Sequence, residues 1–284
     1  MTINPLEFDY IRTFVFDQAG IVLEAGKQYL VESRLAPVAK ARNMASFAAL
    51  ISGLQAGDLA LRRAVIEAMT TNETTFFRDV APFDALRDHV VPQLLEARKA
   101  SRELRFWYGA SSTGQEPYSV VMLLQQHFPQ LASWKVSHYA TDINVEVIEK
   151  ARRGRYNQVE INRGLPATHL VKHFEKAGME WQLKPAIRDQ VRFEQLNLVK
   201  PWPLLPTFDV IMLRNVMIYF DVDSKRQILT RLAGRLAPDG YLFLGGAETT
   251  MGVVDTFQRL PYERAGCYCR TDSPIAQSAK KGAA

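Results

Sequence analysis

The sequence has little of several features that mark whole classes of proteins. Only two cysteines, Cys267 and Cys269, occur in 284 residues. Their C-x-C spacing matches neither a C-x-x-C redox pair nor half of a zinc finger. Residues two apart on a strand point to the same face, so we expect two small buried apolar side chains. Such scarcity of cysteine fits a reducing compartment.

Long apolar runs, a secretory signal and dense basic runs are also missing. A membrane-spanning helix needs ~20 apolar residues, and the longest candidate, 210–220, is interrupted by Arg214 and Asn215. The amino-terminal segment has early acids and no basic region. We therefore expect a cytoplasmic protein, with no direct membrane insertion, that approaches a membrane only by binding something embedded there.

The net charge of +5 is mild. No Lys/Arg run with interleaved aromatic residues occurs, so charge is weak evidence for a nucleic-acid partner and fits an acidic partner equally well. We expect no nucleic-acid partner, and we expect a monomer.

Two kinds of patterning divide the chain. Residues 1–70 have apolar side chains at three- and four-residue steps, as in Phe8, Ile11, Phe14 and Val15, which predicts helices. From about residue 104, β-rich runs alternate with helical runs; the expected strands are 104–110, 134–142, 191–198, 208–215 and 241–246. This alternation predicts a mostly parallel sheet with helices on both faces, and a cofactor at the carboxyl ends of its strands.

The expected domains are 1–70, all helical, and 71–272, an α/β domain. A subdomain at about 165–192 interrupts the alternation, with a helix at 167–174 and an antiparallel hairpin within 179–191. The tail, 273–284, has one bulky apolar residue, Ile275, and is expected to be disordered.

Two strand ends carry candidate ligand-binding residues. The turn 109–119, GASSTGQEPYS, has small residues that allow close backbone approach and opens a helix with free N–H groups, although a plain connector fits equally well. Asp142 ends the second strand, where an acid accepts hydrogen bonds from ribose hydroxyls. A helix N-cap is an equally good interpretation of Asp142.

Three further segments are informative. RNVMIYF, 214–220, places Arg214, Asn215 and Tyr219 among apolar neighbours, where buried polar groups need partners, so a site is favoured over a structural network. Locally, TTNETTFFRD, 70–79, is typical of a helix start capped by Asn72 or Thr71. His169 and His173 have metal-binding spacing but no third ligand, so we expect surface or interface histidines and no metal site.

Together these segments resemble the chemotaxis receptor methyltransferases, the CheR family. The matching pieces are TTNETTFFRD, ASSTGQEPYS, ATDIN, NL at 197–198, LRNVMIYF and LAPDGYLFLGGAE. They occur in the family's order over roughly residues 5–270. The resemblance implies a small all-α amino-terminal domain that recognises the receptor, followed by a Rossmann-like SAM-dependent methyltransferase domain carrying a small antiparallel β-subdomain.

The resemblance also implies S-adenosylmethionine as the cofactor and S-adenosylhomocysteine as the product. Arg78 and Tyr219 would lie beside the reacting methyl group and form the catalytic pair. The family's cofactor-binding positions map onto Asn72, Thr74, Arg78, Ala110, Glu116, Asp142, Asn197, Leu198, Arg214 and Asn215.

The implied substrate is a glutamate side chain in the cytoplasmic helical region of a chemotaxis receptor, with recruitment to membrane receptor arrays. Lys27, Arg34, Lys40 and Arg42 are candidates for meeting that acidic surface. Family members that tether to a receptor's carboxyl-terminal pentapeptide have a glycine-rich insertion in the subdomain. Here residues 174–193 contain one glycine, Gly178, and Pro185 is expected to blunt an edge strand, so we expect no tether.

Some residues depart from the family pattern, and two other functions compete. Gln115 replaces the first Glu of E-E-P-Y-S, Asn144 stands where Asp or Ser is commoner, and GGAE replaces G-H-S-E. A methyltransferase acting on amino nitrogen has N-P-P-Y after the fourth strand, whereas Val216, Met217 and Ile218 follow Asn215 here. A non-enzymatic docking module is disfavoured because the key polar residues are retained, and a nicotinamide enzyme because the glycine fingerprint is missing.

Overall fold

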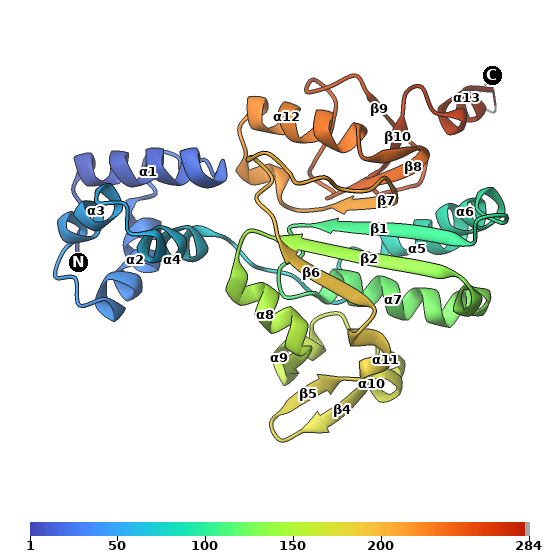
Figure 1. Cartoon of the computed structure of the whole chain (residues 1–284), viewed down its shortest axis with the longest axis horizontal. Coiled ribbons are helices and arrows are strands. Elements are labelled where there is room, and N and C mark those ends of the chain that lie inside the picture. Colours follow the sequence, from blue (N-terminus) through green and yellow to red (C-terminus); the bar gives the residue numbers. More distant parts are fainter. Residues whose placement is uncertain (282–284) are drawn as a thin grey trace.

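The amino-terminal domain is a bundle of four helices that buries one face of each helix (Figure 1). The computed structural model describes residues 1–281. The helices are α1 (Pro5–Ala19), α2 (Gln28–Ala41), α3 (Phe47–Gln55) and α4 (Leu59–Met69). Asn4, Ser46 and Asp58 cap three of the helices by accepting backbone hydrogen bonds. The apolar periodicity of the sequence is therefore confirmed, because the buried residues of all four helices form one core.

A seven-stranded sheet forms the second domain, with strand order β6-β2-β1-β7-β8-β10-β9. The strands are β1 (Glu103–Gly109), β2 (Lys135–Asp142), β6 (Val191–Gln195), β7 (Phe208–Leu213), β8 (Leu236–Leu244), β9 (Phe257–Arg259) and β10 (Cys267–Arg270). The pairs that join β6, β2, β1, β7 and β8 are parallel, and β10 is antiparallel to β8. Every residue of β7 is buried, as expected for a central parallel strand covered on both faces.

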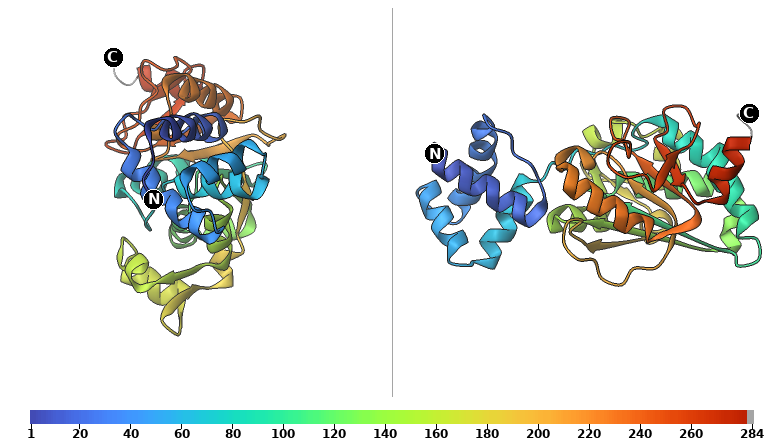
Figure 2. Two further views of the ribbon diagram at one scale, coloured as in Figure 1. Left: turned by 90° about the vertical axis from the view of Figure 1, so that its left-hand side faces the viewer. Right: turned by 90° about the horizontal axis from the view of Figure 1, so that it is seen from above.

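Helices before and between the strands cover the sheet (Figure 1). Their bounds are α5 (Val80–Ala85), the π-helix η1 (Leu86–Val90), α6 (Val91–Ala97), α7 (Gln115–His127), the 3-10 helix η2 (Pro129–Ser133), α8 (Val145–Arg153), the 3-10 helix η3 (Met217–Tyr219) and α12 (Val222–Ala233). The carboxyl ends of β1 and β2 point toward the amino-terminal domain (Figure 1), which lies to one side of the α/β domain in the right-hand view of Figure 2 as well. Ligands of open α/β sheets bind at this edge.

A small antiparallel sheet, β3-β5-β4, stands apart from the main sheet. Its elements are β3 (Arg155–Asn157), α9 (Gln158–Asn162), α10 (Ala167–His173), β4 (Phe174–Ala177), β5 (Glu180–Leu183) and α11 (Pro185–Arg188). The subdomain therefore begins about ten residues before the expected boundary. The hairpin expected within 179–191 is instead β4–β5, which turns at Gly178 with φ +64°. Pro185 opens α11, where proline's missing N–H costs nothing, so it does not blunt an edge strand.

The tail differs from the expectation of disorder. Residues Pro274–Lys281 form a helix, α13. Ala276 is buried and belongs to the core of the α/β domain, and the Ser273 hydroxyl accepts a hydrogen bond from the Ile275 N–H at 3.1 Å. The prediction of disorder is therefore wrong for 274–281, while residues 282–284 lie outside the described part of the chain.

Two expectations from composition can be checked directly. Cys267 and Cys269 are free and buried on β10, as predicted. No helix within residues 1–281 is both long and apolar enough to cross a bilayer.

Candidate active site

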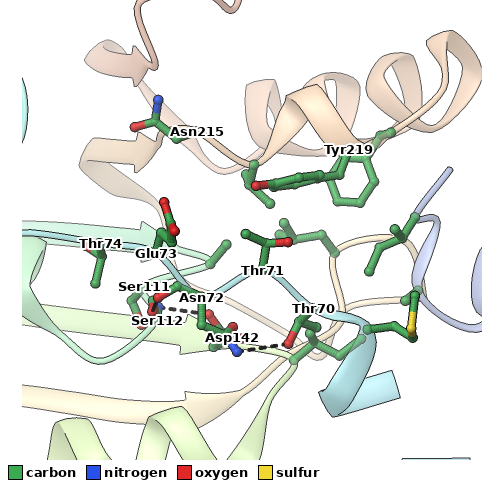
Figure 3. Close-up of a pocket in the computed structure, with 18 of the residues that line it drawn as sticks. Thr70, Thr71, Asn72, Glu73, Thr74, Ser111, Ser112, Asp142, Asn215 and Tyr219 are labelled. Atoms are coloured by element: carbon green, nitrogen blue, oxygen red, sulfur yellow. Dashed lines mark hydrogen bonds between the residues drawn. The ribbon is translucent and has the colours of Figure 1, made fainter. Parts of the chain in front are cut away.

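A pocket opens at the carboxyl ends of the parallel strands and is walled on its other side by the amino-terminal domain (Figure 3). Its free volume is about 1190 Å³ when counted to its open mouth. Ten of the eleven site residues expected from the sequence line it: Asn72, Thr74, Arg78, Ala110, Glu116, Asp142, Leu198, Arg214, Asn215 and Tyr219. These residues come from segments far apart in the chain, and the fold brings them together around one pocket.

Asn197 is the exception. Its side chain points to the amino-terminal domain, where Nδ2 donates to the carbonyl of Gln18 at 2.7 Å and Oδ1 accepts from the Val199 N–H at 3.1 Å. Asn197 does not line the pocket, although its neighbours Leu196 and Leu198 do. Its side chain thus links two domains instead of facing a ligand.

The turn after β1 has the backbone conformation of a close-approach loop. Ala110 and Ser112 have φ of +53° and +51°, and Gly114 has +90°. The Ser111 hydroxyl is buried beside the pocket and has no hydrogen-bond partner among the described residues. An unsatisfied buried hydroxyl at this place is available to a ligand.

Asp142 ends β2 and fixes this turn. One carboxylate oxygen accepts the Ser112 N–H at 2.8 Å and the other accepts the Asn144 N–H at 2.9 Å. Burial raises the pKa of Asp142, while these backbone hydrogen bonds oppose the rise. The side chain of Asn144, and not that of Asp142, caps α8 by accepting the N–H groups of Glu146 and Val147. The helix-cap interpretation of Asp142 is therefore wrong.

A buried ion-pair network lies beneath the pocket. The Arg214 side chain is 1% exposed, and its two terminal nitrogens bind Glu116 Oε2 at 2.6 Å and Asp79 Oδ2 at 2.8 Å. Burial raises the pKa of Glu116, and Arg214 counteracts this. The Arg214 Nε–H has no partner in the described part of the chain. This orphaned donor in the pocket wall is suited to an anionic or polar ligand group.

The segment 70–79 is an extended loop and not the helix start that its local sequence favours. The first helix after it, α5, begins only at Val80. The Asn72 carbonyl accepts the Ser112 hydroxyl at 2.8 Å, and the Asn72 amide donates to Thr70 Oγ1 at 3.1 Å (Figure 3). Arg78 Nη1 donates to the Glu73 carbonyl at 3.0 Å. The loop is therefore hydrogen-bonded directly to the turn after β1.

Opposite this loop, Asn215 and Tyr219 face the pocket from the segment after β7 (Figure 3). Asn215 has φ +59°, a conformation that needs outside support in a non-glycine residue. Buried Glu248 supplies it: Oε2 accepts the N–H groups of Asn215 at 2.8 Å and Gly245 at 2.6 Å, and Oε1 accepts that of Met217 at 2.6 Å. We call these three hydrogen bonds the Glu248 clamp. The sequence did not predict the clamp, and the acid retained in GGAE was its only signal.

The amino-terminal domain completes the wall. Ile21 forms an antiparallel bridge with Phe220, and the Val22 N–H donates to the Tyr219 carbonyl at 2.9 Å. Arg34, expected at a receptor-binding face, instead lines the pocket and donates to the carbonyls of Met69 at 2.7 Å and Thr70 at 3.1 Å. Arg34 therefore fixes the start of the 70–79 loop.

His169 and His173 are buried and not at the surface. The His169 ring stacks on Phe77 with centroids 4.9 Å apart and on His173 at 5.5 Å. Burial lowers the pKa of His173 to about 4. The pair lies at an internal interface between the small subdomain and the 70–79 loop. Within residues 1–281 no cluster of three or more His, Cys, Asp or Glu is placed to hold a metal.

The pocket's chemistry fits the cofactor that the resemblance implies. Asp142 offers acceptors for ribose hydroxyls, and apolar side chains of Ile143, Leu196, Leu198 and Phe220 offer a surface for an aromatic base. The orphaned Ser111 hydroxyl and Arg214 Nε–H offer donors for polar ends. The residues present therefore fit a nucleoside linked to an amino-acid group.

Comparison with known proteins agrees with this geometry. The family model described as the CheR methyltransferase all-alpha domain matches residues 6–70, and that of the CheR methyltransferase SAM binding domain matches residues 72–265. Chemotaxis protein methyltransferase 1 of Pseudomonas aeruginosa is 40% identical over 263 residues, which are 91% of this chain and 95% of the relative. Chemotaxis protein methyltransferase Cher2 of Pseudomonas putida is 38% identical over 263 residues, with the same coverage of each chain.

Among solved structures, PKMT2 from Rickettsia typhi in complex with AdoHcy matches with a TM-score of 0.37 and 14% identity. The match covers 62% of this chain and 26% of that one. The two family models together span nearly the whole described chain, and the pocket lies where they meet. The chain belongs to the CheR methyltransferase family and is a SAM-dependent chemotaxis protein methyltransferase.

Proposed function

We propose that this methyltransferase esterifies glutamate side chains in the cytoplasmic helical region of chemotaxis receptors. The observation that carries the proposal is that Arg78 and Tyr219 line the same pocket as Asp142, Glu116 and Arg214. An arginine, whose planar guanidinium is suited to orient a carboxylate, therefore lies in the same pocket as the residues expected to hold the methyl donor. The relatives' names, which call them chemotaxis protein methyltransferases, support the same function.

We further propose how the pocket holds the cofactor. Asp142 binds the ribose hydroxyls, and Ser111 and the backbone of Ala110 lie against the nucleoside. Arg214 and Glu116 form a buried pair of opposite charge that suits the carboxylate and ammonium groups of the cofactor's amino-acid end. Asn72, Thr74, Arg78, Leu198 and Asn215 complete the binding surface, and Asn197 acts through its contact with α1.

The chemistry asks little of the protein beyond positioning. When bound, SAM supplies an electrophilic methyl group on a sulfonium. A glutamate side chain has a solution pKa near ~4.3, so it is anionic at neutral pH and no general base is required. The bound cofactor would supply this methyl group to the carboxylate oxygen, with the sulfur as the leaving group that keeps the electron pair. Arg78 orients the carboxylate through its planar guanidinium, and Tyr219 closes the opposite side.

The receptor is expected to meet the amino-terminal domain as well. Lys27 and Lys40 are the candidates that remain on that face, because Arg34 and Arg42 donate to backbone carbonyls within the domain. We propose that the enzyme works as a cytoplasmic monomer that reaches membrane receptor arrays by binding receptors. Charge reversal at Lys27 and Lys40 should then raise the KM for the receptor, more strongly at low salt.

We also propose that the enzyme needs no carboxyl-terminal tether on its receptor. The β4–β5 hairpin has only Gly178 and Met179 between its strands, with no glycine-rich insertion. The test combines calorimetric titration with receptor pentapeptides and methylation of a receptor that lacks those residues. Micromolar peptide binding, together with a large loss of methylation on truncation, would contradict the proposal.

The main test uses radiolabelled SAM and receptor-containing membranes. The expected result is protein-bound label that mild base releases, because carboxyl methyl esters are base-labile and N-methyl groups are not. Arg78→Ala should fold and lose most of this labelling, whereas Arg78→Lys should keep part of it. Base-stable label would show an amino-nitrogen acceptor, and full turnover by Arg78→Ala would remove Arg78 from the reaction.

A further inference from the structure

A second hollow, which we call the arginine groove, adjoins the cofactor pocket. Its walls are Arg78, Arg259 and Arg264, and Asn215, Gly246 and Ala247 lie between them. Arg78 and Asn215 line both the groove and the cofactor pocket. The two cavities therefore meet beside the residue proposed to orient the accepting carboxylate.

The groove's positive charge is only partly offset by neighbouring acids in the described part of the chain. Arg259 is exposed and forms no ion pair or side-chain hydrogen bond with any described residue. Arg264 has only a loose contact of 3.8 Å with Glu263, and both side chains are more than four-fifths exposed. The one acid in the wall, Asp79, is paired with Arg214 at 2.8 Å. Three arginines and a single acid, which is half exposed and bound to Arg214, thus line the groove and leave it with an excess of positive charge.

The turn that carries Arg264 is anchored on both sides. Tyr262 stacks on His89 with ring centroids 4.5 Å apart, and Ala265 is buried in the core. Arg264 itself has φ +55° and lies between these two anchors. The anchored backbone limits the positions that the Arg264 guanidinium can reach. The side chain therefore loses less conformational entropy when it binds a partner.

The space between the arginines is open. A Cβ added at Gly246 would meet no atom within 4 Å. By contrast, a Cβ at Gly245 would lie 2.7 Å from the Asn215 side chain. Small residues therefore leave the groove wide where a partner's backbone would pass, while its inner end is closely packed around Asn215.

We propose that the arginine groove binds the acidic side chains that flank the methylated glutamate in the receptor. The inference rests on the proposed function and adds a docking site that the amino-terminal domain does not provide. A helix with several carboxylates on one face complements three guanidinium groups, and its central glutamate would reach Arg78. Arg259 and Arg264 select the substrate and take no part in methyl transfer.

The experiment measures methylation of a receptor cytoplasmic fragment at saturating SAM. Arg259→Glu/Arg264→Glu should raise the KM about fivefold to tenfold at low salt, with a smaller rise at high salt and nearly unchanged kcat. SAM affinity by calorimetry should stay unchanged. Arg259→Lys/Arg264→Lys should keep most of the wild-type KM, because the charge is retained. Arg153→Glu/Arg163→Glu is the matched control: both arginines are exposed and lie outside the groove, and the change in charge is the same.

Two results would overturn the docking site. One is equal KM values for Arg259→Glu/Arg264→Glu and for the control. The other is loss of generic duplex DNA binding in the groove variant with an unchanged receptor KM, which would show a nucleic-acid surface. Failure of the proposed function has a different signature, namely base-stable label or none with the wild-type enzyme.

Discussion

Glu248 offers the sharpest test of how the active site is held in shape. Its two carboxylate oxygens accept three backbone N–H groups, from Asn215, Gly245 and Met217, at 2.6–2.8 Å. In Glu248→Gln the amide oxygen can keep the two bonds that Oε2 makes. The amide nitrogen then takes the place of Oε1, which accepts the Met217 N–H. That N–H loses its acceptor and faces another N–H donor instead.

The expected cost follows from these contacts. A buried donor left without a partner costs about 1–3 kcal/mol, and the cost is larger where the lost partner was charged. We therefore expect Glu248→Gln to lower the free energy of unfolding by about 2–4 kcal/mol. SAM affinity should fall as well, since Asn215 lines the pocket and loses its support. Urea unfolding and calorimetric titration measure the two effects.

A glycine pair provides an independent check on the same clamp. A Cβ at Gly245 would lie 2.8 Å from Glu248 Oε2 and 2.9 Å from the Asn215 N atom, whereas a Cβ at Gly246 would meet nothing within 4 Å. Gly245→Ala should thus destabilise the enzyme by about 1–3 kcal/mol and weaken SAM binding, and Gly246→Ala should do neither. If Glu248→Gln and Gly245→Ala both match wild type in stability and affinity, the clamp does not hold the site.

Three further predictions concern other parts of the molecule. Asp142→Ala should weaken SAM and SAH binding by about 1–3 kcal/mol, and unchanged affinity in a folded variant would refute a ribose contact. Burial lowers the pKa of His138 to about 3; the unfolded chain therefore binds more protons than the native one below pH 6.5. This histidine should reduce the free energy of unfolding by about 2 kcal/mol at pH 5 relative to pH 8, and His138→Gln should be less acid-sensitive in urea titrations. Arg34→Ala should weaken SAM binding by loosening the loop that starts at Thr70, unlike Lys40→Ala, and equal calorimetric Kd values would contradict that link.

The sequence predicted the sheet because β-rich apolar runs alternate with helical ones, most clearly at β7 and in the second half of β1. β7 is buried throughout and Asp142 ends β2, so periodicity and strand ends located both the core and the binding edge. The cofactor residues were found through motif resemblance, and most converge because parallel strands end at one edge. Local sequence patterns were sufficient to predict an element wherever the contacts that determine it are close in the sequence.

The features that the sequence did not reveal depend on contacts between distant residues. The side chain of Asn197 turns toward Gln18, 179 positions earlier, and no local pattern signals that partner. His169 and His173 lie at an internal interface, one of the two positions expected, because Phe77 stacks on His169, which stacks on His173. An isolated helix does not reveal which residues cover it. The carboxyl-terminal helix forms because Ala276 joins the core, whereas its composition alone favours disorder.

The pocket wall built by both domains has a consequence for folding. The helical domain and the sheet domain each have their own hydrophobic core, yet Ile21 and Phe220 pair across the boundary in the wall of the pocket. A molecule that contacts both walls acts as a noncovalent crosslink between two units able to unfold separately. Ligand binding then stabilises their association by mass action. Saturating SAH should merge the melting of the two domains into one cooperative transition. The reaction product would then also stabilise the contact between the domains.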